Sequence, residues 1–296
     1  MTIPQNIIAH QDQLRILKDS YNGRFPHSWV LHGKKGVGKY TTLLNFINTI
    51  YKKTKNLNQK IFEINSDEKP ALLEDVRDLI TQINLTNSNS NETAFIIIDN
   101  AELLNFNSYN ALLKIIEEPP RNTAIFIISH NLKKIPKTII SRCAILLFKS
   151  LNKDEILKYC NLFDIDLKEF DLEKNFNLID GSISKLLTLI DDDGRFVKEK
   201  LLEIIQGKSF KINEFERLYD HVSKDYSKYS QIIYDCIFET LKKEFLMYSN
   251  NRKVTRDILK FFSSIEIFTK QNINVDNKKE LHYLLSEYIK INSYGQ

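Results

Sequence analysis

The residues best suited to do chemistry lie in the stretch GKKGVGKYT, from Gly33 to Thr41. Glycines at this spacing, followed by Lys39, let peptide N–H groups wrap around a phosphate, and a helix that begins there adds positive potential. Lys39 would reach the terminal phosphates of a nucleotide. A turn with chance glycines is the alternative, but the chain has only 8 glycines, and Gly33, Gly36 and Gly38 fall at these offsets. The stretch predicts a phosphate-binding loop.

The residue after the loop lysine departs from what hydrolysis needs. A small hydroxyl at this place normally binds Mg²⁺, whereas this chain has Tyr40, whose phenol is too long and bulky. Thr41 carries a hydroxyl, but one further residue along a helix is turned by ~100°, away from the ligand position. We therefore expect a site that is compatible with ATP or ADP and in which Mg²⁺ binding is impaired.

A second part of a nucleotide site lies in AFIIIDNAELL, where Asp99 ends an apolar run. A carboxylate there can hold Mg²⁺ through water, and an active hydrolase usually has glutamate next, to polarise the attacking water. Here the next residue is Asn100, whose amide cannot act as a base. Glu102 is two positions farther on and is expected to point elsewhere. The alternative is that Asp99 and Asn100 only cap the following segment.

Apolar runs and helical patterns alternate in the first half of the chain, and these must position the loop. Compact runs rich in Ile and Phe suit buried parallel strands, and strands that alternate with helices predict a doubly wound α/β domain. The expected strands cover 28–33, 61–65, 94–99, 124–129 and 144–148. The helical patterns follow the loop, lie around 72–83 and lie around 112–116, where the last one stops at Pro119.

Strand patterns end after about residue 150, and the rest of the chain is typical of helices. Short helices are expected over 153–190 and longer ones from about 194 to the end, with turns near 207, 250–251 and 274. The predicted division is an α/β domain over 1–150, a small helical domain over 151–193 and a helical C-terminal domain over 194–296.

Composition and cysteine content exclude several classes of protein. The net charge of +4 permits contact with nucleic acid without requiring it. Cys143, Cys160 and Cys236 are isolated, which excludes a disulfide framework and a metal-ligand spacing. The start lacks the layout of a signal peptide, and the apolar runs are too short to cross a bilayer. We expect a cytoplasmic protein with no membrane partner.

Three further stretches carry a family resemblance. NALLKIIEEPP (110–120) follows the Asp99 strand, SHNLKKIPKTIISRC (129–143) follows the next strand, and GSISKLL (181–187) opens the last short helix. In this order and spacing, over roughly residues 5–190, the sequence resembles the AAA+ clamp-loader subunits. The resemblance implies a P-loop AAA+ domain, a helical lid and a helical C-terminal collar that joins subunits, with the boundaries given above.

The resemblance gives a role to the arginine of Ser-Arg-Cys. In that family this arginine is an arginine finger, which acts on ATP bound to the neighbouring subunit, so Arg142 is the expected catalytic residue. A guanidinium aimed at the charge that develops on a γ-phosphate contributes about 10³–10⁵ in rate. Ser141 and Cys143 are expected to fix the turn and to pack. A solvated surface arginine without a role is the alternative.

Two further positions match the sensor residues of the family. His130 is the expected first sensor, with Asn131 able to share the role, although a loop histidine without a task fits the position equally well. Lys185 matches the basic residue of the second sensor, which would reach the nucleotide from the lid, while an exposed helical lysine is also commonplace. The expected nucleotide-binding residues are Gly33, Gly36, Gly38, Lys39, Thr41, Asp99, His130 and Lys185.

The chain also departs from the family. Members commonly carry a cysteine-rich zinc module between the loop and the Asp99 strand, but residues 48–62 contain no cysteine, so no zinc is expected. The motor subunits, gamma and tau, retain the Mg²⁺ hydroxyl and the glutamate that are replaced here by Tyr40 and Asn100.

The leading hypothesis is a clamp-loader subunit that does not hydrolyse ATP and lends Arg142 to a neighbour. Its implied partners are the gamma/tau and delta subunits, with the sliding clamp and primed DNA reached through the complex. An ATPase in which Thr41 and Glu102 compensate, and a pure scaffold, remain alternatives. A cluster of three lysines could contact DNA phosphates, be solvated or face acidic groups on a neighbour; it comprises Lys133, Lys134 and Lys137.

Overall fold

The computed structural model describes residues 9–54, 61–65, 73–87, 93–207, 211–249, 251–270 and 276–293. The chain divides into two compact units, one made of Met1–Ile165 with Gly181–Ile183 and the other of Asp166–Asp180 with Ser184–Gln296. Within the described residues, no helix has the length and apolar character needed to cross a membrane. The predicted three-domain division stays a prediction, and the turn expected near 274 lies outside the described residues.

A five-stranded parallel sheet forms the centre of the first unit, as the apolar runs predicted. The strand order is β2-β3-β4-β1-β5, and the register places Ile127 between Val30 and Ile98. Since helices cover both faces, the central strands β3 and β4 are buried along nearly their whole length rather than alternating between buried and exposed residues. The strands are β1 (Ser28–His32), β2 (Ile61–Asn65), β3 (Ala94–Asp99), β4 (Thr123–Ser129) and β5 (Ala144–Leu147).

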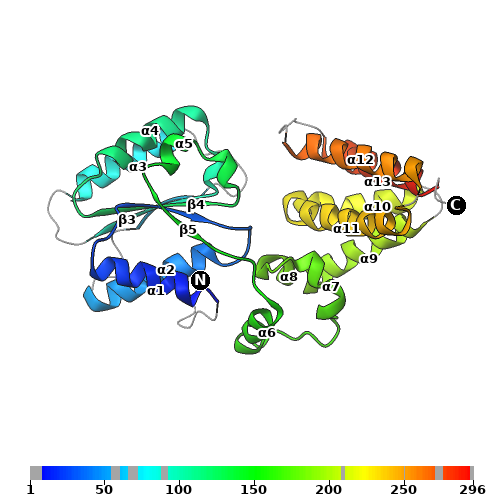
Figure 1. The fold of residues 1–296 in the computed structure, drawn as a ribbon, viewed down its shortest axis with the longest axis horizontal. Coiled ribbons are helices and arrows are strands. Elements are labelled where there is room, and N and C mark those ends of the chain that lie inside the picture. Colours follow the sequence, from blue (N-terminus) through cyan, green and yellow to red (C-terminus); the bar gives the residue numbers. More distant parts are fainter. Residues whose placement is uncertain are drawn as a thin grey trace. The chain divides into compact units, whose positions relative to one another are not determined.

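Helices form a layer on each face of this sheet, and two apolar cores result (Figure 1). On one face, buried residues of α3, α4 and α5 pack against Val30, Ile98 and Ile127. On the other face, α1 and α2 pack on Trp29, Phe95 and Phe126. The helices of this unit are α1 (Gln11–Asn22), α2 (Lys39–Thr54), α3 (Leu73–Asn87), α4 (Phe106–Glu117), α5 (Lys137–Ile140) and α6 (Lys153–Leu162), with 3₁₀ turns η1 (Ala101–Leu103) and η2 (Leu132–Lys134).

Helices are the regular elements of the second unit among its described residues, as the sequence predicted. Its core includes Leu201 of α9, Ile237 of α11 and Leu284 of α13, all fully buried. Its helices are α7 (Leu172–Ile179), α8 (Ile183–Ile190, whose first residue belongs to the first unit), α9 (Asp192–Gln206), α10 (Ile212–Val222), α11 (Tyr226–Met247), α12 (Arg252–Lys270) and α13 (Asn277–Ser293), with the 3₁₀ turn η3 (Ser223–Asp225).

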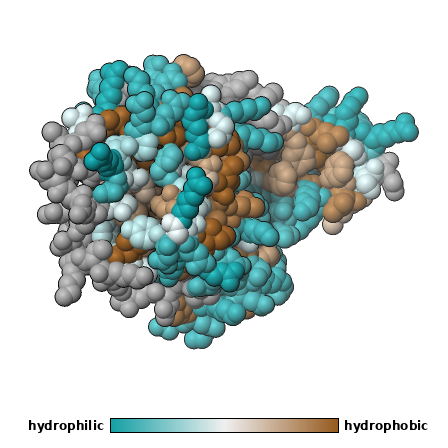
Figure 2. Space-filling view, turned by 60° about the vertical axis from the view of Figure 1, so that its left-hand side comes forward, coloured by the Kyte–Doolittle hydropathy of each residue, from teal (hydrophilic) through white to brown (hydrophobic). Residues whose placement is uncertain are grey.

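The surface is mostly polar with apolar patches between, as Figure 2 shows for one face. On β5, which pairs only with β1 among the described strands, Ile145 and Leu147 are about half exposed. Single exposed apolar side chains are ordinary on soluble proteins.

Candidate phosphate site and arginine surface

The predicted phosphate loop joins the carboxyl end of β1 to α2, in the middle of the sheet. β1 pairs with β4, so the loop is next to the end of β4, where His130 follows the strand. Asp99 ends β3, which is the next strand beyond β4. Ligands of open parallel sheets bind at this edge, where the strand order reverses. Gly33 is packed so tightly here that an added Cβ would lie 2.2 Å from the Phe148 carbonyl oxygen.

Most carbonyl groups of the loop are held by the protein itself. The Gly36 carbonyl accepts from the Ile183 peptide N–H at 3.0 Å, and the Val37 carbonyl accepts from His10 Nε2 at 2.8 Å. The Gly38 carbonyl accepts from both the peptide N–H and the hydroxyl of Thr42. Gly36 and Gly38 adopt positive φ values of 75° and 101°, a conformation that glycine takes without strain.

Because these carbonyl groups are already hydrogen-bonded, the peptide N–H groups are the part of the loop that can bind a ligand. Among the residues that the structure describes, the N–H groups of 35–38 have no acceptor. Successive unpaired N–H groups before a helix form an anion-binding concavity. The backbone therefore retains the arrangement that a phosphate needs.

Lys39 is buried and folded back onto the loop. Its ammonium donates to the carbonyl oxygens of Gly33 and Lys34, both at 2.7 Å, and lies 2.8 Å from Nδ1 of His130. Three acceptors match the three protons of an ammonium. Burial lowers the pKa of Lys39 to about 8, although Asp99 and Glu102 favour the charged form.

His130 connects the loop lysine to the position where an active hydrolase carries glutamate. Its Nδ1 faces the Lys39 ammonium, and its Nε2 lies 2.7 Å from Oδ1 of Asn100. Burial and the nearby ammonium lower the pKa of His130 to about 4. A neutral ring that accepts at Nδ1 and donates from Nε2 satisfies both contacts. Asn100 thus bonds to His130 with its side chain and makes no side-chain cap for η1.

The expectation that Glu102 points away from the site is wrong. Its carboxylate accepts from the His130 peptide N–H at 3.1 and 3.3 Å, because η1 turns the chain back toward β4. Asn100 makes that turn possible by adopting a left-handed conformation with φ 51°, which asparagine tolerates better than most residues. Asp99 accepts from the Asn100 peptide N–H at 2.9 Å. Glu102 is therefore engaged as a structural acceptor.

The residues after Lys39 turn away from the loop. The Tyr40 hydroxyl donates to Glu63 of β2 at 3.0 Å, and burial and Glu63 raise its pKa to about 12, so it stays a neutral phenol. Thr41 is exposed on α2. Neither hydroxyl is placed as a Mg²⁺ ligand beside the loop, and no group of three or more His, Cys, Asp or Glu side chains suited to a metal occurs among the described residues.

Two residues that the sequence analysis did not assign, His10 and Ile183, hold the loop from outside. His10 has φ 62°, and burial lowers its pKa, which suits its bond to the Val37 carbonyl. Ile183 is placed by Gly181, which has φ 71° and whose carbonyl accepts from Leu151 N–H. In the sequence, the available signals were His10 just before one expected helix and Gly181 just before another. Neither signal predicts a hydrogen bond to the backbone of the loop.

Arg142 lies on the surface, just after α5. Its Nη1 donates to the Thr138 carbonyl at 3.1 Å and lies 3.4 Å from Oγ of Ser141. Its Nη2 lies 2.9 Å from Oε1 of Glu117, the last residue of α4. The side chain is 43% exposed. Cys143 is half-buried beside the first apolar core, as expected for a packing residue.

The remaining predicted binding residue, Lys185, lies in the second unit. It forms an ion pair at 2.5 Å with Asp235 of α11. Burial raises the pKa of Asp235, against the effect of Lys185. Its role as a second sensor stays a prediction.

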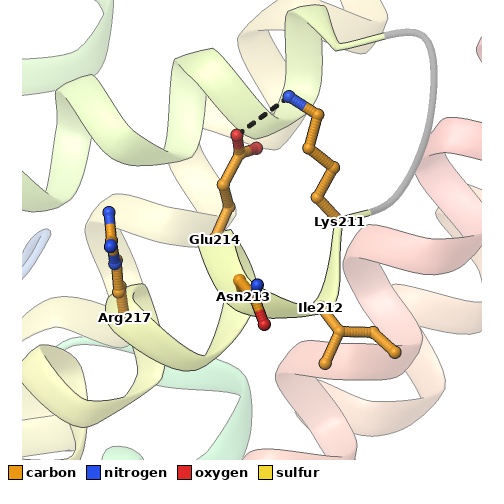
Figure 3. A pocket seen from close by; sticks show the side chains of 5 residues that line it. All are labelled: Lys211, Ile212, Asn213, Glu214 and Arg217. Carbon is orange, nitrogen blue, oxygen red and sulfur yellow. Dashed lines mark hydrogen bonds and ion pairs between the residues drawn. The ribbon is translucent and has the colours of Figure 1, made fainter.

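The second unit also has a shallow pocket of about 520 Å³ at the start of α10 (Figure 3). Lys211 and Glu214 form an ion pair at 3.0 Å across it, and Arg217 lies at its margin. These charged side chains are at the surface, so none of the described residues that line the pocket is a buried polar group that points to a particular ligand.

Comparison with known proteins bears out the family resemblance. Residues 9–152 match a family model described as DNA polymerase III, delta subunit. The DNA polymerase III subunit gamma of Buchnera aphidicola (from Acyrthosiphon pisum) is 30% identical over 190 residues, which cover 57% of this chain and 52% of that protein. Replication factor C subunit 3 of Blastobotrys adeninivorans is 25% identical over 238 residues, covering 80% of this chain and 63% of that protein.

A solved structure confirms the fold. A DNA polymerase III gamma subunit-related protein from Thermotoga maritima superposes with a TM-score of 0.57 at 17% identity, covering 94% of this chain and 99% of that one. The sequence comparisons thus bear out the resemblance to clamp-loader subunits, and the solved structure bears out the fold. The chain spans about half the length of the curated DNA polymerase III relatives named gamma that it matches.

Proposed function

We propose, from this family resemblance, that the chain serves as a clamp-loader subunit of the delta-prime kind in a bacterial DNA polymerase III holoenzyme. It helps to load the sliding clamp onto primed DNA, together with gamma/tau and delta subunits. It does not hydrolyse ATP itself, and it lends Arg142 to the ATP site of a neighbour. The observation that carries the proposal is the contrast between the exposed Arg142 and the internally engaged Lys39, Asn100 and Glu102.

The loop's own chemistry supports binding without hydrolysis. The N–H groups of 35–38 would hold the phosphates of ADP or ATP, and the Lys39 ammonium would join them by exchanging one of its three internal contacts for a phosphate oxygen. Tyr40 and Thr41 do not fit a Mg²⁺ site, so no catalytic step is assigned to this chain's own loop. Asn100 cannot take a proton from water at neutral pH.

An ATP-hydrolysing role is the second candidate, and the position of Glu102 favours it. Its carboxylate lies at the end of β4, close enough for its charge to favour the protonated form of Lys39. In addition, relatives that match this chain are named gamma or tau subunits. Both carboxylate oxygens of Glu102 accept from the same peptide N–H, however, and this contact fixes the carboxylate against the start of the segment after β4.

The test is ATP turnover by the reconstituted loader with DNA and clamp, comparing wild type with Arg142→Ala and Arg142→Lys. A trans-acting finger predicts a fall of at least about tenfold for the alanine variant and incomplete recovery by lysine, whose ammonium lacks the planar fork. Size-exclusion chromatography checks assembly. Unchanged turnover in an intact complex would reject the finger and leave a scaffold.

A further inference from the structure

Arg142 is held in place within the isolated chain. Its guanidinium contacts three oxygens, namely the Thr138 carbonyl at 3.1 Å, Ser141 Oγ at 3.4 Å and Glu117 Oε1 at 2.9 Å. The first two belong to the same turn as the arginine. Glu117 comes from another helix, so it alone fixes the direction in which the side chain leaves α5.

The backbone under the arginine is rigid. The Arg142 peptide N–H donates to the Ile139 carbonyl at 3.0 Å, and the Ser141 hydroxyl donates to the Thr138 carbonyl at 3.1 Å. Ile139 is fully buried in the core beneath α5. The position of the Cα atom is therefore set, and the remaining freedom is in the long side chain.

Glu117 is presented by an equally fixed element. α4 begins at the capping residue Asn105, whose side chain accepts from the Ser108 N–H, and it buries Leu112, Ile115 and Ile116 against the sheet. Glu117 follows directly after this buried face and is itself exposed. Its carboxylate consequently has no role in the core that would explain its position.

We infer that Glu117 is a positioning residue for Arg142, an inference that rests on the finger function proposed above. The carboxylate orders the guanidinium before a neighbour docks, so the arginine side chain loses less conformational entropy when it contacts a phosphate. The two side chains are 43% and 50% exposed, which keeps their attraction weak in water. A phosphate of higher charge on the neighbour can then replace the carboxylate.

The test uses Glu117→Ala, Glu117→Gln and Arg142→Ala, together with the Glu117→Ala/Arg142→Ala double variant, in the reconstituted loader, with kcat and KM for ATP measured separately. Glu117→Ala should lower kcat by about two- to fivefold, the factor that corresponds to the free energy of an exposed ion pair, while KM and assembly stay unchanged. Glu117→Gln keeps an acceptor oxygen and should recover most of kcat. The double variant should be no slower than Arg142→Ala, since Glu117 acts only through the arginine.

A matched control is Glu118→Ala, which removes the adjacent exposed carboxylate and should leave kcat unchanged. A normal or increased kcat for Glu117→Ala, beside a large fall for Arg142→Ala, overturns the inference and leaves the finger function standing. A further fall in the double variant also overturns it, because Glu117 would then act independently. If Arg142→Ala itself has no effect, the finger function and this inference both fail.

Discussion

At the scale of residues, the phosphate site differs from an active one in how its groups are engaged. Lys39, His130 and Asn100 form a continuous chain of contacts, in which each group meets a donor or acceptor of the protein. An active hydrolase needs a general base where this chain has the amide of Asn100, and a side-chain hydroxyl that ligates Mg²⁺ where it has the phenol of Tyr40. The residue types could be read from the sequence, but the contact between His130 and Lys39 required the fold.

The pKa of Lys39 leads to a prediction for ligand binding. The free ammonium has a pKa of about 8, and a bound phosphate favours the charged form, so affinity falls as pH rises above about 8. We expect ADP binding by calorimetry to weaken up to about tenfold between pH 8 and 9, well above the range near pH 6 in which the ADP phosphate itself titrates. His130, with a pKa of about 4, stays neutral across this range.

Lys35→Ala provides the control for this titration, because Lys35 is an exposed lysine of the same loop. It should keep the pH profile, whereas Lys39→Ala should bind weakly at every pH. A flat affinity through pH 9 would contradict the lowered pKa, and no binding at pH 7 would contradict the phosphate-loop interpretation.

At the scale of elements, the loop depends on segments distant in sequence. The segment before α1 holds Val37 through His10, and the start of α8 holds Gly36 through Ile183. Strand and helix positions were predictable because apolar periodicity and glycine spacing are local signals. The hydrogen bonds to the Val37 and Gly36 carbonyl groups were not predictable, since every residue has a backbone carbonyl and its type does not show which donor it meets.

Gly181 gives the sharpest test of these ties. An alanine there would adopt φ 71°, and its Cβ would lie 2.6 Å from backbone atoms of Leu151. We expect Gly181→Ala to lower the free energy of unfolding by about 1–3 kcal/mol from backbone strain alone, measured by urea denaturation. Gly207→Ala, at φ −66° and ψ 143°, is the control and should change it by less than about 1 kcal/mol. Equal effects would show that Gly181 is not constrained.

At the scale of the whole molecule, the chain combines an engaged phosphate site with an exposed arginine on the same α/β unit. The order of apolar runs was enough to predict the parallel sheet and the helical remainder, and the family motifs were enough to single out Arg142. Glu117 and Glu102 were missed as partners, because their contacts join ends of elements that only the sheet topology brings together.

The most direct measurement of the central claim compares Lys39→Ala with Arg142→Ala in the same reconstituted loader. Stimulated ATP turnover should fall at least about tenfold for Arg142→Ala, because the finger acts in the neighbour's site. It should stay within about twofold of wild type for Lys39→Ala, because this chain's own loop does not contribute to turnover. The reverse pattern, a large fall for Lys39→Ala with Arg142→Ala near normal, would contradict the account and identify the chain as a motor subunit.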